Sequence, residues 1–241
     1  MDYNRPLNAS KDNPKVHIAL LMAPGTHINP NEHSISPLLL NPGGPGGPGT
    51  WFAMFFGKPL QAILGADQDV IGFDPRGVGS TTPRADCYSD PWGSSDPDAQ
   101  YNFGYVDYLN GFYKRISWLL PSIQIGLVNS TSSALTQLDV RARTLGKLCA
   151  QTDSLHGNNS IFRHLQTPNV ARDMLSIIDA WDEWRDALDS RSKPSSDITD
   201  LPVESESKYP LDTKGKLVFW GFSYGVGFAS LLFSDKLTLA I

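Results

Sequence analysis

One serine in the sequence occupies a position where its hydroxyl could act as a nucleophile. Ser223 is the middle residue of Gly221–Phe222–Ser223–Tyr224–Gly225, which fits the pattern Gly-x-Ser-x-Gly. The apolar run 216–220 before it predicts a buried strand, and the small and apolar residues after it predict a helix. A sharp strand-to-helix turn exposes the serine hydroxyl, and the flanking glycines prevent a clash. We predict that Ser223 is a nucleophile; the alternative is an ordinary glycine-rich turn.

A second turn could bind the negative charge that forms when a serine attacks a carbonyl group. The run 41–49 follows a short apolar strand and contains five glycines and three prolines in nine residues. Such a loop exposes its backbone N–H groups. We expect the N–H of Gly44 and the N–H of Tyr224 to form an oxyanion hole. A flexible linker is the alternative, although a linker would not be expected between an apolar strand and an apolar helix.

A third turn, at 74–80, reads Asp-Pro-Arg-Gly-Val-Gly-Ser. It lacks the Lys-Ser/Thr ending of a phosphate-binding loop and fits no dinucleotide-binding pattern. We therefore interpret Asp74 and Arg76 as structural groups that hold this turn against the loop 41–49.

The three turns are connected by alternating strands and helices. Apolar runs predict strands at 15–22, 37–41, 69–74 and 216–220, and helical spacing predicts helices at 50–64, 106–119, 134–150, from 167 onward and at 226–233. This alternation predicts an α/β fold with a mostly parallel sheet flanked by helices. Two polar stretches interrupt the pattern: a surface excursion at about 89–104 and a polar insertion at about 190–214.

Composition excludes several classes of protein. The chain has 241 residues, of which 40% are hydrophobic and 19% charged, as in a folded globular protein. Its net charge of −5 argues against a nucleic-acid partner. No apolar run is long enough to span a bilayer. The sequence contains no Cys-x-x-Cys, His-Glu-x-x-His or His/Cys cluster, so we predict no metal.

Taken in order, the motifs at 41–49, 69–80 and 221–225 resemble those of the proline iminopeptidase and tripeptidyl aminopeptidase family of α/β-hydrolases. The stretch 167–174, Thr-Pro-Asn-Val-Ala-Arg-Asp-Met, is similar to the helix that precedes the nucleophile turn in secreted members. The resemblance covers nearly the whole chain. It implies an α/β-hydrolase fold, Ser223 as nucleophile, and hydrolysis of a peptide amide or a small ester through an acyl-enzyme, with no cofactor.

The sequence departs from this family at the acid and base of the catalytic triad. In this fold the triad follows the order Ser, Asp, His. After Ser223 there is one aspartate, Asp235, and no histidine; all five histidines (His17, His27, His33, His156 and His164) precede the serine. We expect these histidines to be surface or loop residues, and Asp235 to end the helix after the serine. The triad acid and base therefore remain unassigned.

We accordingly expect residues 1–241 to form an incomplete α/β-hydrolase domain, truncated after the helix that follows Ser223. The chain is then a fragment, a protein completed by a second chain that supplies acid and base, or a binding protein that has lost catalysis. An esterase-type hydrolase of a biosynthetic pathway is a further alternative, because the fold does not fix the substrate.

The cellular location depends on conflicting signals. The N-terminus has no hydrophobic export signal, which leaves a cytoplasmic location as the alternative. The family resemblance implies secretion, and three glycosylation sequons, at Asn8, Asn129 and Asn158, agree with it. The two cysteines, Cys87 and Cys149, form either a disulfide or two buried thiols, and their spacing alone does not decide.

Overall fold

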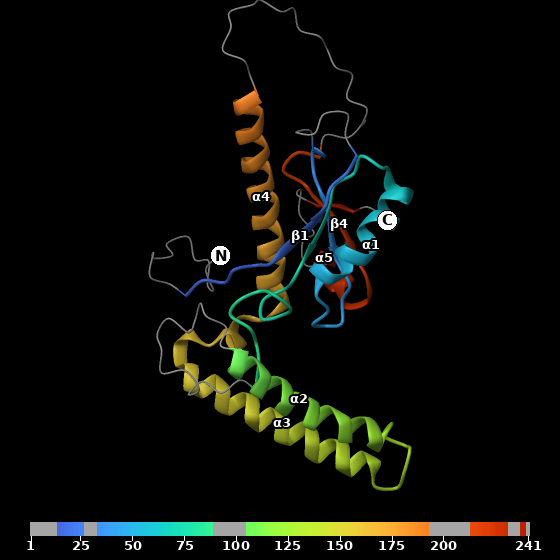
Figure 1. Ribbon diagram of the computed structural model, residues 1–241, viewed down its shortest axis with the longest axis vertical. Helices are drawn as coiled ribbons and strands as arrows, with labels where there is room; N and C mark the ends of the chain where they lie inside the picture. Colours follow the sequence, from blue (N-terminus) through green and yellow to red (C-terminus); the bar gives the residue numbers. More distant parts are fainter. Residues whose placement is uncertain (1–13, 27–32, 89–104, 193–212, 231–236, 240–241) are drawn as a thin grey trace, which may run out of the picture. The chain divides into compact units, whose positions relative to one another are not determined.

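The computed structural model describes residues 14–26, 33–88, 105–192, 213–230 and 237–239 (Figure 1). Contacts divide the chain into two compact units. Unit 1 comprises Met1–Arg84 and His164–Ile241, and unit 2 comprises Ala85–Arg163. Unit 2 is thus inserted in the sequence between the two parts of unit 1. The expectation of one incomplete domain over 1–241 stays a prediction.

Unit 1 is built on a sheet whose described strands have the order β1-β3-β2-β4-β5. Strands β2, β3, β4 and β5 run parallel, and β1 pairs with β3 in the antiparallel sense. The sheet is therefore mostly parallel, as the sequence predicted. The strands are β1 (Leu20–Ala23), β2 (Leu38–Asn41), β3 (Val70–Phe73), β4 (Leu217–Gly221) and β5 (Leu237–Leu239).

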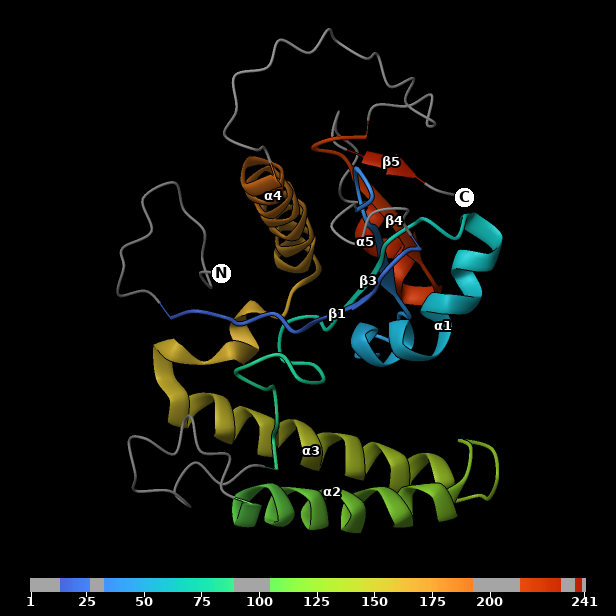
Figure 2. The same ribbon diagram turned by 45° about the horizontal axis from the view of Figure 1, so that its top comes forward.

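Helices cover both faces of this sheet (Figure 2). Alternate residues of a strand point to opposite faces. Leu38 and Leu40 of β2 accordingly join the core cluster that includes Leu60 of α1 (Gly49–Leu64), and Leu39 joins the cluster formed with α4 (Thr167–Ser192). The second cluster also contains Phe228 of α5 (Val226–Ser230). Strands β2 and β3 are buried on both faces, which explains their apolar sequences.

Unit 2 contains two long antiparallel helices, α2 (Tyr105–Ile125) and α3 (Ala134–His156). Two short 3₁₀ turns follow, η2 (Gly157–Asn159) and η3 (Ile161–His164). A disulfide joins Cys87, which precedes α2 in the chain, to Cys149 of α3. The spacing of the cysteines left this pairing open, and the structure resolves it.

Several predicted boundaries differ from those in the structure. The first strand begins at Leu20 and not at residue 15, because His17 pairs with Thr82 in an isolated bridge before the regular ladder starts. Helix α2 continues to Ile125 through Pro121. The polar insertion was predicted from residue 190, but residues 190–192 belong to α4. The excursion 89–104, most of the insertion and Asp235 lie outside the described residues.

Candidate active site

The turn that carries Ser223 has an unusual backbone. Strand β4 ends at Gly221, Phe222 is extended with φ −109° and ψ 142°, and a 3₁₀ turn, η4 (Ser223–Gly225), leads into α5. Ser223 has φ +53°, the one positive value among the described non-glycine residues. A left-handed backbone costs an L-residue roughly 1–2 kcal/mol. Such strain is concentrated at functional sites, and here it accompanies an exposed serine.

The two glycines that flank this turn have no room for a side chain. A Cβ atom on Gly221 would lie 2.6 Å from the carbonyl carbon and oxygen of Gly225. A Cβ atom on Gly225 would lie 2.9 Å from the carbonyl oxygen of Asn41. The Gly-x-Ser-x-Gly pattern therefore has a steric cause at both ends.

The loop that follows β2 packs directly against the serine turn. Gly43 has φ +85°, and a Cβ atom there would lie 2.2 Å from the Phe222 carbonyl oxygen and 2.9 Å from the Tyr224 nitrogen. Asn41, which is only 1% exposed, connects the two segments: its carbonyl oxygen accepts the Phe222 N–H at 3.0 Å. Its side-chain oxygen accepts the Gly43 N–H at 2.8 Å.

In this arrangement some backbone N–H groups donate a hydrogen bond within the fold and others do not. The Gly43 N–H donates to Asn41. Within the described part of the chain, the N–H groups of Gly44 and Tyr224 have no hydrogen-bond partner. An oxyanion hole requires N–H donors of this kind, fixed in place and not used by the fold.

Asp74 connects the third turn to the start of α1. Its Oδ1 accepts the Thr50 N–H at 2.9 Å, and its Oδ2 accepts the Ser80 N–H at 2.8 Å. Pro48, at the N-cap of α1, provides no side-chain cap. The buried Asp74 carboxylate therefore satisfies one N–H of the first helical turn and complements the positive end of the helix dipole.

Arg76 has a partner that the sequence did not indicate. It forms a buried, two-point ion pair with Asp173 on α4. This pair fastens the turn 74–80 to α4. The predicted role of Arg76 in holding the turn against the loop 41–49 stays a prediction. Asp173 was visible only as one residue of the 167–174 motif.

The comparison with known families agrees with this geometry. A family model described as alpha/beta hydrolase fold matches residues 36–160, just over half of the chain. The chain belongs to the alpha/beta hydrolase fold family. The matched segment includes the loop 41–49 and the turn 74–80, and it ends before Ser223.

Two curated relatives from Mycobacterium tuberculosis are similar to parts of this hydrolase-family chain. One is a serine protease named Hip1, with 37% identity over 90 residues, covering 37% of this chain and 15% of the relative. The other is named carboxylesterase B, with 29% identity over 124 residues, covering 48% of this chain and 21% of the relative. The matches thus cover about a fifth of these relatives' length or less.

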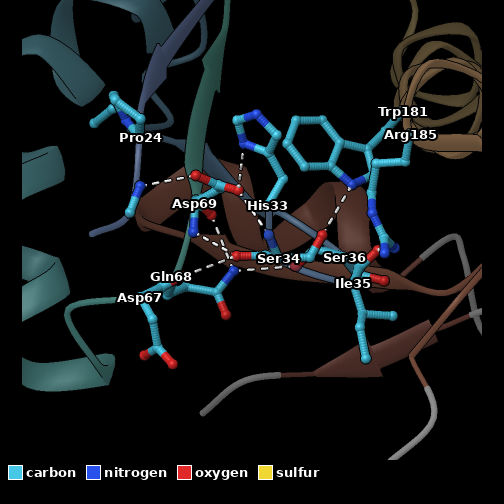
Figure 3. Close-up of polar contacts among 12 residues, drawn as sticks. Pro24, His33, Ser34, Ile35, Ser36, Asp67, Gln68, Asp69, Trp181 and Arg185 are labelled. Carbon is cyan, nitrogen blue, oxygen red and sulfur yellow. Dashed lines mark hydrogen bonds and ion pairs between the residues drawn. The ribbon is translucent and has the colours of Figure 1, made fainter. Parts of the chain in front are cut away.

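A serine nucleophile in this family fold requires a base, and the described residues do not bring one to Ser223. Among them, no side chain forms a hydrogen bond with the Ser223 hydroxyl. His33 pairs instead with Asp69, Nδ1 to Oδ2 at 3.2 Å (Figure 3). Asp69 precedes β3 whereas Ser223 follows the parallel strand β4. The four residues of β3 rise about 3.3 Å each. The end of the sheet where the parallel strands begin, which carries Asp69, is therefore roughly 13 Å from the end where they finish, which carries Ser223.

The His33–Asp69 pair belongs to a hydrogen-bond network at the end of the sheet where β3 begins. The Asp69 carboxylate also accepts the N–H groups of Gly25 and Ser34, at 2.7 and 2.8 Å. Trp181 donates its ring N–H to the Ser34 carbonyl oxygen at 3.3 Å, as Figure 3 shows. His33 and Asp69 therefore link loops to α4 and do not serve Ser223.

One further contact beside the serine was not predicted. The hydroxyl groups of Tyr224 and Thr167 lie 2.6 Å apart. Thr167 is the first residue of α4, so this bond connects the serine turn to the start of the helix that also carries Asp173. Hydroxyl pairs leave no signal in sequence, because either partner is common on surfaces.

Proposed function

We propose that this chain contributes the nucleophile and the oxyanion hole of a serine hydrolase. The Ser223 oxygen attacks the carbonyl carbon of a peptide amide or a small ester and gives its proton to the base. The C–N or C–O bond then breaks, the amine or alcohol leaves with a proton, and water hydrolyses the resulting acyl-enzyme. The N–H groups of Gly44 and Tyr224 stabilise the oxyanion. The observation that carries this proposal is the strained, exposed Ser223 beside two N–H groups that have no partner in the described structure.

The acid and base of the triad come, in this proposal, from outside the described residues. A serine hydroxyl without a base at hydrogen-bond distance is a weak nucleophile. We infer that they are supplied either by further polypeptide of the same protein or by a complementing chain. The five histidines of the chain have no assigned part in the reaction.

The substrate class is proposed from the relatives. One bears the name of a serine protease and the other that of a carboxylesterase, so both amide and ester hydrolysis have support. The resemblance of the three turns to tripeptidyl and prolyl aminopeptidases favours cleavage near the N-terminus of a peptide. No cofactor takes part in the proposed reaction.

A fluorophosphonate probe, which labels only activated serines, tests the nucleophile. In the protein that includes the triad acid and base, on further polypeptide or on a complementing chain, we expect labelling that disappears in Ser223→Ala and persists in Ser154→Ala, a matched change at an exposed serine of α3. Absence of labelling in that folded, completed protein would contradict the assignment of Ser223 as the nucleophile. Hydrolysis of aminoacyl-arylamides compared with aryl esters then separates a peptidase from an esterase.

We also propose that the protein works in an oxidising compartment. Disulfides persist in secreted proteins and are rare in the cytosol, and Cys87 and Cys149 are joined. Mass measurement of the native protein with and without an alkylating agent tests this: two free thiols in protein isolated from its source would contradict it.

A further inference from the structure

The turn that joins α2 to α3 contains an acceptor sequence for an N-linked sugar. Asn129, Ser130 and Thr131 fit the pattern Asn-x-Ser/Thr, with no proline in the middle position. A pattern this short also arises by chance, so its structural setting has to decide whether it is used. An attached sugar is bulky and hydrated, and it therefore requires an asparagine on the surface of an exported protein.

Asn129 lies in the middle of a tight, exposed turn between the two helices (Figure 1). The Leu127 carbonyl oxygen accepts the Ser130 N–H at 2.9 Å, and the Ser130 hydroxyl oxygen accepts the Leu127 N–H at 2.7 Å. Asn129 is thus the third residue of a four-residue turn. Every residue from 126 to 133 is exposed. Within the described part of the chain the Asn129 amide forms no hydrogen bond, so the turn leaves this group accessible.

The hydroxyl group of this sequon is exposed as well. Thr131 is exposed, and its Oγ1 lies 3.5 Å from the Ser133 hydroxyl, at the outer limit of a hydrogen bond. A sugar-transferring enzyme recognises the hydroxyl residue together with the asparagine two positions before it. The turn therefore presents both parts of the recognition sequence on its surface.

A second sequon in the described structure lacks this property. Asn158 is exposed, but Ser160, which supplies the hydroxyl, is only 1% exposed. The Ser160 hydroxyl oxygen accepts the Phe162 N–H at 3.3 Å, and the hydroxyl donates to the Asp153 carboxylate and lowers the pKa of that group. Folding thus uses the hydroxyl at Ser160, whereas it leaves the one beside Asn129 exposed. The sequon at 158–160 provides an internal comparison.

The disulfide gives an independent reason to expect this modification. Cys87 is joined to Cys149, which lies on α3, the helix that follows the turn. The lumen of the endoplasmic reticulum is one of the oxidising compartments in which disulfides form, and N-linked sugars are transferred to asparagine in the same lumen. The inference therefore rests on the oxidising compartment proposed above and does not depend on the activity of Ser223.

We propose that Asn129 carries an N-linked oligosaccharide. The donor is an oligosaccharide attached to a lipid through a diphosphate. The Asn129 amide nitrogen forms a bond to C1 of the first sugar and loses a proton, the bond between C1 and the diphosphate oxygen breaks, and the lipid diphosphate leaves. The hydrogen bonds that close the turn persist, because they use Leu127 and Ser130 and not the Asn129 amide.

A sugar at Asn129 decides between the two cellular locations that the sequence left open. Such oligosaccharides are attached in the secretory pathway and not in the cytosol, so a chain that carries one has been exported. No helix in the described part of the chain is both long and apolar enough to span a membrane.

Peptide mass spectrometry of the protein isolated from its source tests the proposal. Peptide N-glycosidase removes an N-linked sugar and converts the modified asparagine to aspartate. The digestion is carried out in heavy-oxygen water, which distinguishes this conversion from earlier spontaneous deamidation. We expect the heavy label at position 129 in most molecules. An unlabelled Asn129 in protein whose Cys87–Cys149 disulfide is intact overturns the proposal.

Variants produced in the same source locate the sugar. We expect Asn129→Gln and Thr131→Ala each to remove the mass of one oligosaccharide from the intact protein. Thr131→Ser should keep it, because the hydroxyl remains. Asn158→Gln is the matched control and should leave the sugar at position 129 in place. All four changes are at exposed residues and should alter the free energy of unfolding by less than about 0.5 kcal/mol.

Two results with these variants contradict the proposal. An Asn129→Gln protein with the same sugar mass as the parent shows that the oligosaccharide is attached elsewhere. A Thr131→Ala protein that keeps the sugar on Asn129 shows that the modification does not follow the sequon, and the assignment then fails as well.

Discussion

The guanidinium group of Arg76 holds the carboxylate of Asp173 by two hydrogen bonds, Nε to Oδ2 at 2.5 Å and Nη2 to Oδ1 at 2.8 Å. Both side chains are almost fully buried. The pair joins the turn after β3 to helix α4. The first residue of α4 is Thr167, and its hydroxyl contacts the Tyr224 hydroxyl. The segments around Ser223 are therefore held from two sides, by Asn41 and by α4.

Removal of Arg76 should destabilise the fold strongly. Arg76→Ala leaves the Asp173 carboxylate buried without its partner, which costs about 3–5 kcal/mol. Arg172→Ala, at an exposed arginine on the same helix, should change the free energy of unfolding by less than about 0.5 kcal/mol. Urea unfolding measures both, and similar losses in the two variants would show that the buried pair has no special role.

The loss caused by Arg76→Ala should depend on pH. Burial raises the pKa of Asp173 above its ordinary value of 3.8, and Arg76 opposes this rise. Without Arg76 the pKa rises further. A carboxyl with a raised folded pKa stabilises the fold below its unfolded pKa, and this contribution is lost as pH increases through the folded pKa. The deficit of the variant should therefore be largest near neutral pH and shrink on acidification toward 3.8; a deficit independent of pH would refute the assignment.

Gly43 and Gly46 provide a matched test of how the loop packs on the serine turn. Both have positive φ, +85° and +99°, but an added Cβ meets the serine turn at Gly43 and open space at Gly46. Gly46→Ala should cost about 1–2 kcal/mol of backbone strain. Gly43→Ala should cost roughly 1–3 kcal/mol more, because it overlaps the Phe222 carbonyl oxygen. Equal free energies of unfolding would mean that the loop does not rest on the turn.

Asp69→Asn should lower the stability of the fold through the loops beside the start of β3, and it should leave the reactivity of Ser223 unchanged. The asparagine has one acceptor where the carboxylate has two, so one buried N–H of Gly25 or Ser34 loses its partner, at a cost of about 1–3 kcal/mol. Asp67→Asn, two residues earlier, is the control. Thermal unfolding measures the loss. A fall in probe labelling of Ser223 in the folded Asp69→Asn protein would argue that the network reaches the serine after all.

Opening the disulfide should loosen unit 2 selectively. Cys87 and Cys149 are separated by 62 residues in sequence, and closing a loop of this length stabilises the fold by about 4 kcal/mol in the chain-entropy model. We expect the Cys87→Ser/Cys149→Ser protein to be cleaved first within 85–163 under limited proteolysis. Cleavage that begins instead within 33–84, at the same rate as in the parent, would contradict this.

The sequence by itself determined four of the five described strands, the order of the three turns and the position of Ser223; it did not indicate β5. These features are local: burial on both faces produces unbroken apolar runs, and a Cβ that would overlap the neighbouring backbone at Gly221, Gly225 or Gly43 leaves glycine as the residue that fits. The pattern of residues therefore reports them directly, and the elements found at 38–41, 70–73 and 217–221 lie where they were expected.

Only the tertiary structure decided which distant residues meet. The pairing of Arg76 with Asp173, the network around Asp69 and the contact of Tyr224 with Thr167 join residues 97, 35 and 57 positions apart. These partners are set by the order and direction of the strands, and the hydrophobic pattern of the sequence does not specify that order or direction. The direction of the strands also puts the His33–Asp69 pair and Ser223 at opposite ends of the parallel strands. The sequence shows that a histidine and an aspartate are present, but it does not show how far they lie from the serine.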